Sequence, residues 1–289
     1  MTIAQAASSK KSSVLILGES GTAKTNYAAQ LYGRLVKESG SLKLREASAD
    51  LTPFSAALER LQSGLEAQHT VSGMFAQVSL KLLGPAGEEL DLVWPDYAGE
   101  QVKDMIEHRK INPDWRKRLS HSQCWLLFIR PTLLRDPQDI FNRPIESLLR
   151  QPVKDAARGS VIWSDQARLI ELLQLLLFAH GTSALQRARC PPLGILLSCW
   201  DEMQVPEGTR PADVLRERVP LLSDFIESRW HPDGRFVLGI APLGKALRKD
   251  EPDVGFVDQG PEQQGWVVSA EGKHTPDLTL PLLELIRRM

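Results

Sequence analysis

The chain has 289 residues, of which 42% are hydrophobic and 25% are charged, a composition typical of a globular protein. Its 35 Lys and Arg residues nearly balance 36 Asp and Glu residues, so no overall charge draws the protein to nucleic acid or to an anionic membrane. The cysteines Cys124, Cys190 and Cys199 are far apart, and the histidines lack metal-binding spacing, so we expect a reduced, cytoplasmic protein without a zinc site. The longest apolar run, residues 169–179, is too short to cross a bilayer.

The first elements form a strand, a loop and a helix. A polar tail, residues 1–13, lacks the apolar core of a signal peptide and is expected to be flexible. The all-apolar run 14–17 is typical of a strand that is buried on both faces. The glycine-containing segment 18–25 follows, and a helical pattern begins within it and runs over 24–36.

The middle of the chain predicts a helix and then a hairpin. A helix is expected to start at Thr52 and Pro53, a suitable cap and first-turn pair. Alternating apolar residues over 76–82 and a return strand over 90–94 predict an antiparallel hairpin at a sheet edge. The remaining elements alternate, with strands at 124–129, 193–198 and 235–241 and helices at 100–110, 165–180, 211–230 and 280–288.

This order of elements predicts an α/β fold. We expect a doubly wound, mainly parallel six-stranded sheet with one antiparallel edge strand. Residues 14–289 are expected to form one domain. The segment 131–164 is longer than a normal strand-to-helix connection, so it is predicted to be an insertion over the top of the sheet.

The sequence GESGTAKT, residues 18–25, nearly matches the phosphate-binding loop G-x-x-x-x-G-K-[ST]. In such a loop, backbone N–H groups and the following helix end surround the phosphates, the lysine reaches the terminal ones and the hydroxyl binds Mg²⁺. Ala23 stands where the pattern has its last glycine. Because the first turn of a helix usually has negative φ, we expect alanine to be tolerated there. The candidate nucleotide-binding residues are Gly18, Glu19, Ser20, Gly21, Thr22, Ala23, Lys24, Thr25 and Asn26.

Two further motifs follow predicted strands. Asp96 to Gly99 forms a D-x-x-G signature at the carboxyl end of a strand, where open α/β sheets bind their ligands. The Asp96 carboxylate is suited to hold Mg²⁺, and the N–H of Gly99 is suited to bond a γ-phosphate. Asp201 lies in LLSCWDE, at the place where small GTPases carry N-K-x-D and bind guanine. Ser198 and Cys199 replace the Asn and Lys, so the lysine stem that lies against the base is missing.

With DYAGE, SCWDE and the tail PDLTLPLLELIRRM, the chain resembles a Ras-like P-loop GTPase of the translation-factor-related class. It is most similar to the double-GTPase family of bacterial conflict systems, over nearly its whole length. The resemblance implies a switch protein that binds GTP and GDP with Mg²⁺ and hydrolyses GTP, in a bacterial conflict or defence setting. It makes Thr70 the switch threonine and a metal ligand beside Thr25 and Asp96, with Thr52 as the competing candidate.

The resemblance also makes Lys24, Glu100 and Gln101 the catalytic candidates. Ras-like enzymes carry a water-orienting Gln after D-x-x-G, but this chain has Glu100 there and Gln101 next. A carboxylate beside the γ-phosphate is repelled unless a cation intervenes, so intrinsic hydrolysis is expected to be slow or to depend on a partner.

Two alternatives to the GTPase remain open. The missing lysine of N-K-x-D favours an ATPase, whereas Ala23 and Glu100 favour a nucleotide-binding scaffold that does not hydrolyse. A protein partner is expected to bind the switch segments and the insertion, and any cis arginine finger would come from Arg130, Arg135 or Arg143. The basic run 108–118 is more typical of a solvated helix face than of a nucleic-acid contact.

Overall fold

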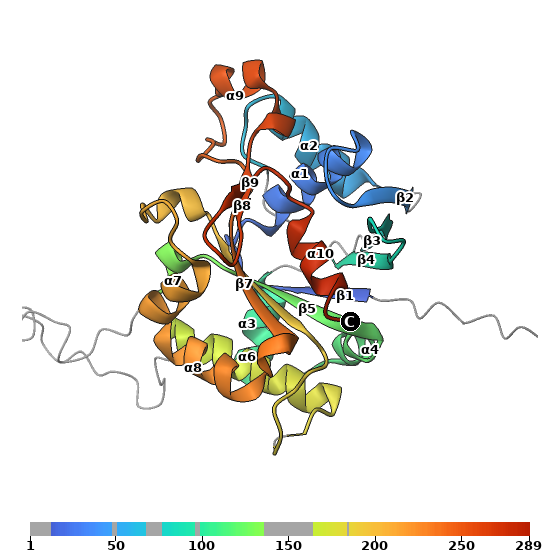
Figure 1. Cartoon of the computed structure of the whole chain (residues 1–289), viewed down its shortest axis with the longest axis vertical. Coiled ribbons are helices and arrows are strands. Elements are labelled where there is room, and N and C mark those ends of the chain that lie inside the picture. Colours follow the sequence, from blue (N-terminus) through green and yellow to red (C-terminus); the bar gives the residue numbers. More distant parts are fainter. Residues whose placement is uncertain (1–12, 48–50, 68–76, 96–98, 136–163, 184) are drawn as a thin grey trace, which may run out of the picture.

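The computed structural model describes residues 13–47, 51–67, 77–95, 99–135, 164–183 and 185–289 (Figure 1). In this part of the chain, nine strands form one sheet in the order β2-β3-β4-β1-β5-β6-β7-β8-β9. They are β1 (Ser13–Leu17), β2 (Lys43–Ala47), β3 (Gln77–Leu83), β4 (Glu89–Pro95), β5 (Ser122–Ile129), β6 (Leu193–Ser198), β7 (Arg235–Ala241), β8 (Trp266–Val268) and β9 (His274–Thr275).

The centre of the sheet is parallel and its flanks are antiparallel. Strands β4, β1, β5, β6 and β7 run parallel to one another, which places their carboxyl ends on one edge. On one flank, β3 pairs antiparallel with β4 and β2 with β3; on the other, β8 pairs with β7 and β9 with β8. The predicted α/β class is therefore confirmed.

The predicted number of strands is wrong, and so is the prediction that the antiparallel hairpin lies at the edge of the sheet. The described residues contain nine strands rather than six, and the antiparallel hairpin β3–β4 lies inside the sheet because β2 pairs with β3 beyond it. β2, with the sequence KLREA, is polar and largely exposed and so lacks the apolar alternation by which a strand is recognised. β8 and β9 have only 3 and 2 residues within the polar stretch before the last helix.

Helices cover both faces of the sheet, because the central strands are apolar on both faces. Leu15 and Leu17 contribute to the core beneath α3, α4, α6, α7 and α8, which lie in the lower half of Figure 1, whereas Val14 and Ile16 pack toward α1 and α10. The helices are α1 (Lys24–Val36), α2 (Thr52–Gln62), α3 (Gly99–His108), α4 (Pro113–His121), α6 (Asp165–His180), α7 (Pro211–Arg218), α8 (Pro220–Arg229), α9 (Val254–Gln259) and α10 (Leu280–Ile286).

Two helices differ from the sequence expectation. The predicted helix 211–230 is divided into α7 and α8, because Pro220 cannot continue a helix and instead opens the second one. The basic run 108–118 enters α4, whose Trp115 is only 2% exposed and joins the core. Arg116 and Lys117 on the same helix are exposed, as expected of a solvated face.

The C-terminal segment packs back onto α1. The Tyr27 hydroxyl donates to the carbonyl of Leu278, and Arg34, which is 2% exposed, donates to the carbonyls of Gln264 and Gly265. Burial lowers the pKa of Arg34 to about 10. The helix that follows the phosphate loop is thus held by residues more than 200 positions further along the chain.

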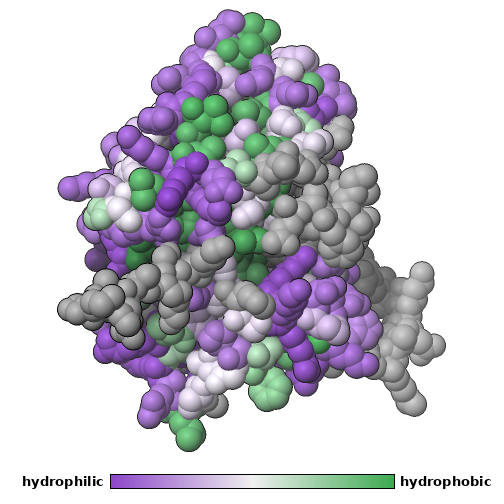
Figure 2. Space-filling view, turned by 90° about the vertical axis from the view of Figure 1, so that its right-hand side faces the viewer, coloured by the Kyte–Doolittle hydropathy of each residue, from purple (hydrophilic) through white to green (hydrophobic). Residues whose placement is uncertain are grey.

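The surface is mainly polar on the side that carries β2, where hydrophobic residues lie in small groups between hydrophilic ones (Figure 2). Among the described helices, none combines the length and the apolar composition needed to span a bilayer.

Candidate functional site

The segment after β1 forms a tight loop at the carboxyl edge of the sheet. Gly18 has φ 146°, and a Cβ there would lie 2.9 Å from the carbonyl oxygen of Phe128 on the neighbouring strand. Gly21 has φ 78°. Gly18 therefore requires glycine for both close approach and backbone conformation, and glycine at Gly21 avoids the strain of a positive φ. The Thr22 hydroxyl donates to the Glu19 carbonyl at 2.9 Å and closes the loop on itself.

Ala23 adopts a conformation that we did not expect. Its φ of 60° and ψ of 20° place it in the left-handed region, immediately before the first residue of α1. The expectation of negative φ is wrong, because Ala23 precedes the helix rather than forming part of its first turn. A non-glycine residue in this region costs about 1–2 kcal/mol. The loop keeps the backbone that glycine normally supplies, at the cost of local strain.

The loop is suited to hold an anion. In the described part of the chain, no hydrogen-bond acceptor outside the loop's own turn at residues 20–21 is found for the backbone N–H groups of residues 19–25. The N-terminus of α1, with its own unpaired N–H groups and positive dipole end, stands directly behind them. This is the chemistry of a phosphate site at the start of a helix.

Lys24 folds back into the loop. Its ammonium donates to the carbonyls of Gly18 and Glu19 at 2.9 and 2.6 Å and to the Thr22 hydroxyl at 3.2 Å. Burial lowers the pKa of Lys24 to about 8, and the Glu19 carboxylate opposes that shift. The positive charge of Lys24 thus lies among the carbonyl and hydroxyl oxygens of the loop.

Glu19 connects the loop to α6. One of its carboxylate oxygens lies 2.8 Å from the Arg168 guanidinium, and both side chains are about one quarter exposed. Burial raises the pKa of Glu19, although the charge of Arg168 opposes this. Arg168 also lies 3.5 Å from Asp165 at the start of α6. The ion pair holds one flank of the loop.

Asp201 lies in a 3-10 turn, Trp200–Glu202, that follows β6. Burial raises the pKa of Asp201, and its own backbone N–H and Arg130 act in the opposite direction. The Ser198 hydroxyl donates to the carbonyl of Ile129 at 3.1 Å, so it joins β6 to β5 rather than to the loop. Trp200 is 5% exposed and its ring packs against Gly239, which makes it a core residue.

Arg130 joins the loop to this turn. Its Nε and Nη2 donate to the two carboxylate oxygens of Glu202 at 2.9 and 2.6 Å, and its Nη1 donates to the Gly21 carbonyl at 3.0 Å. The Thr132 hydroxyl donates to the same carboxylate at 2.9 Å. Burial alone would lower the pKa of Arg130, but the hydrogen bond with Glu202 and nearby negative charges raise it.

The predicted metal ligands are only partly described. Thr25 is half-buried in the first turn of α1, beside Lys24, while Thr70 and Asp96 lie outside the described residues. Among the described residues, no cluster of three or more His, Cys, Asp or Glu side chains could hold a metal. The Thr25 hydroxyl is an oxygen donor of the kind that Mg²⁺ binds, and the whole set of metal ligands stays a prediction.

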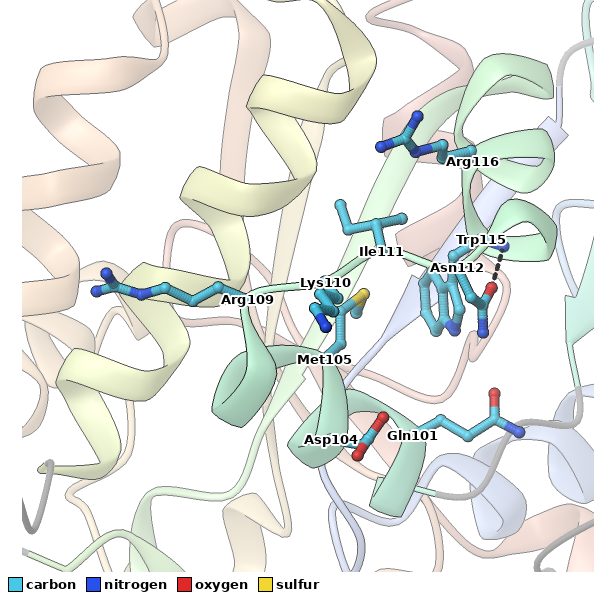
Figure 3. Close-up of a pocket in the computed structure, with 9 residues that line it drawn as sticks. All are labelled: Gln101, Asp104, Met105, Arg109, Lys110, Ile111, Asn112, Trp115 and Arg116. Atoms are coloured by element: carbon cyan, nitrogen blue, oxygen red, sulfur yellow. Dashed lines mark hydrogen bonds between the residues drawn. The ribbon is translucent and has the colours of Figure 1, made fainter. Parts of the chain in front are cut away.

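The residues after the D-x-x-G motif belong to α3, which begins at Gly99 and includes Glu100. Gln101 on this helix lines a pocket of about 640 Å³ between α3 and α4, together with Asp104, Met105, Arg109, Lys110, Ile111, Asn112, Trp115 and Arg116 (Figure 3). Arg109 extends from it toward α6, where it pairs with Glu171 at 2.7 Å. The structure thus groups Gln101 with the α3–α4 pocket.

The two ends of the predicted insertion meet. The backbone N–H of Arg135 donates to the Asp165 carboxylate at 2.7 Å, although residues 136–163, including Arg143, lie outside the described part. The sequence did not predict the contacts Arg130–Glu202 and Glu19–Arg168. The one available signal was that Arg130 directly follows a strand, at the edge where ligands bind.

Comparison with known proteins gives a family and a distant structural likeness. The model of the family Double-GTPase 1 matches residues 15–285. No curated protein matches the chain. A chain of the signal recognition particle receptor SRb-GTP/SRX complex from Chaetomium thermophilum is 14% identical, with a TM-score of 0.40, covering 82% of this chain and 93% of that one.

Proposed function

Since this chain belongs to the Double-GTPase 1 family, we propose that it is a guanine-nucleotide switch that hydrolyses GTP with the aid of Mg²⁺. The observation that carries the proposal is the pair of loops at the carboxyl edge of the sheet. The strained glycine loop with Lys24 follows β1, and the turn with Asp201 follows β6, with only β5 between these strands. Open α/β sheets bind nucleotides at this edge.

The phosphates would lie in the loop. The backbone N–H groups of residues 19–25 have no acceptor outside the loop's own turn in the described part of the chain, and Lys24 adds a positive charge. A bound phosphate would replace the Gly18 and Glu19 carbonyls as the acceptor for that ammonium. Charge-assisted hydrogen bonds of this kind contribute about 1.5–3 kcal/mol each.

The base would be recognised by Asp201. An ionised carboxylate accepts two hydrogen bonds from the N1–H and N2–H₂ edge of guanine, whereas adenine has an acceptor at N1 and no amino group at C2. Partial burial of Asp201 strengthens this selection, because a carboxylate left without donors is costly there. This favours GTP over ATP.

Thr25, Asp96 and Thr70 would hold Mg²⁺, with Asp96 acting directly or through water. The ion supplies charge neutralisation between the β- and γ-phosphates. In the same proposal, Glu100 and Gln101 are the water-positioning candidates. Repulsion between the Glu100 carboxylate and the γ-phosphate makes intrinsic turnover slow, so that a partner sets the lifetime of the GTP state. The setting in a bacterial defence system rests on the sequence resemblance.

The nucleotide that co-purifies with the protein tests the proposal. The protein is denatured and the released nucleotide identified by chromatography, and affinities for GTP, GDP and ATP are then measured by calorimetry with and without Mg²⁺. We expect guanine nucleotides, with tighter GTP binding in Mg²⁺. Preference for ATP would replace the GTPase by the ATPase alternative, and tight binding without turnover would favour the non-hydrolysing scaffold.

A further inference from the structure

Arg130 occupies the gap between the two halves of the proposed nucleotide site. It follows β5 directly, and β5 lies between the strand that leads into the phosphate loop and the strand that leads into the Asp201 turn. Its guanidinium contacts both, through the Gly21 carbonyl on one side and Glu202, the neighbour of Asp201, on the other. A nucleotide with its phosphates in the loop and the edge of its base at Asp201 would extend across the region where Arg130 lies.

The hydrogen bonds of Arg130 are all made at the edge of its guanidinium. Nε and Nη2 form a two-point pair with Glu202, Nη1 donates to Gly21, and the Thr132 hydroxyl fixes the carboxylate from the other side. All these bonds are made at the edge of the planar group. The Arg130 side chain remains 27% exposed. A guanidinium held in this way interacts with further groups by stacking, as it does on aromatic rings and nucleic-acid bases.

The residues next to Asp201 supply no comparable surface on which a base could stack. Cys199, at the lysine position of N-K-x-D, is a short side chain in the left-handed region with φ 53°. Burial raises the pKa of its thiol to about 12, so it carries no charge at neutral pH. Trp200 is turned into the core against Gly239. Among the side chains described around Asp201, Arg130 is the planar group that bridges to the loop.

On the basis of the proposed function, we propose that the guanidinium plane of Arg130 is the surface on which the guanine base lies, in place of the missing lysine stem. Because Glu202 neutralises its charge, Arg130 contributes to binding of the base rather than of the phosphates. An arginine finger needs free N–H donors that reach the γ-phosphate, so the role proposed for Arg130 differs from that of an arginine finger.

Calorimetry with GTP and with inorganic triphosphate, both in Mg²⁺, separates base binding from phosphate binding. We expect Arg130→Ala and Arg130→Lys to lower the affinity for GTP about tenfold and to change the affinity for inorganic triphosphate by less than about twofold. Arg130→Lys should have this effect because a lysine keeps the charge but lacks the planar group. Arg168→Ala is the matched control, because it removes an arginine that pairs with Glu19 on the other flank of the loop. Arg168→Ala should change the affinities for GTP and for inorganic triphosphate by the same factor.

Equal losses of GTP and inorganic triphosphate in the Arg130 variants, or no loss, would overturn the assignment. A spectroscopic measurement on the wild type tests it without relying on stable variants. The Nε–H resonance of Arg130 should move upfield when GTP binds, from the ring current of the base, and should not move so with inorganic triphosphate. An unchanged resonance with GTP would refute stacking. If the wild type binds GTP no better than inorganic triphosphate, the proposed function fails instead.

Discussion

The phosphate end and the base end of the proposed site differ in how far they depart from the family pattern. The phosphate end keeps Gly18, Lys24 and Thr25 of the phosphate-loop pattern, and at Ala23, which replaces the last glycine of the pattern, the backbone still adopts the left-handed conformation. The base end keeps only Asp201 of the N-K-x-D pattern, and Arg130, which follows a different strand, contacts both its neighbour Glu202 and the phosphate loop. In the proposed site, backbone geometry is therefore preserved where N–H groups would bind the phosphates, whereas side chains differ from the family pattern where side chains would bind the base.

The largest effect is expected at the phosphate end. Lys24→Met should weaken GTP and GDP by at least about 100-fold, because it removes a charge that several phosphate oxygens share. The apo protein should stay folded, since the substitution also removes the desolvation cost that lowers the pKa of Lys24. Calorimetry and thermal melting measure the two effects. Unchanged affinity would exclude the phosphate-loop assignment.

The base end should respond by a change in specificity. Asp201→Asn should weaken GTP by up to about 100-fold and strengthen xanthosine triphosphate, whose C2 oxygen accepts from the amide. Competition binding with GTP, ATP and the xanthine nucleotide on both proteins measures the shift. Asp224→Asn, the same substitution at an exposed position of α8, is the control and should leave the nucleotide preference unchanged. If the preference of Asp201→Asn does not move, Asp201 does not read the base.

The pH dependence of nucleotide affinity tests whether Lys24 contacts phosphate. The pKa of Lys24 is lowered to about 8 in the free protein, and bound phosphates favour its charged form. Affinity for GDP should therefore be constant below pH 8 and fall above it, approaching about tenfold per pH unit. The Lys24→Arg variant keeps its charge at high pH, so its GDP affinity should not show this fall. Subtracting one affinity profile from the other removes the contribution from the titration of guanine itself. Parallel profiles would show that Lys24 does not contact phosphate.

The smallest effect is expected from Ala23→Gly. Because Ala23 has φ 60°, glycine should relieve strain and raise the free energy of unfolding by about 1 kcal/mol. Ala28→Gly in the regular part of α1 should lower it instead. Chemical denaturation of the two variants and the wild type gives these values. A loss of stability in Ala23→Gly would mean that the alanine side chain contributes more than its strain costs.

The sequence predicted the parts of the fold that local patterns determine. The apolar runs located β1, β5, β6 and β7, the hairpin pattern located β3 and β4, and the motif GESGTAKT located the loop. It could not predict β2, β8 and β9, which owe their strand state to pairing with a neighbour rather than to their own composition. The Arg130–Glu202 pair was also beyond reach, because its two residues are 72 positions apart and meet only when β5 and β6 pair.

The anchoring of α1 by the C-terminal segment has a consequence for biosynthesis. Arg34 and Tyr27 are buried against carbonyls of Gln264, Gly265 and Leu278, and an arginine buried without acceptors is costly. While the chain is emerging from the ribosome, the helix behind the phosphate loop therefore lacks its covering until residues 264–278 have been made. Nucleotide binding should become available only late in translation, which prevents an incomplete chain from acting as a switch.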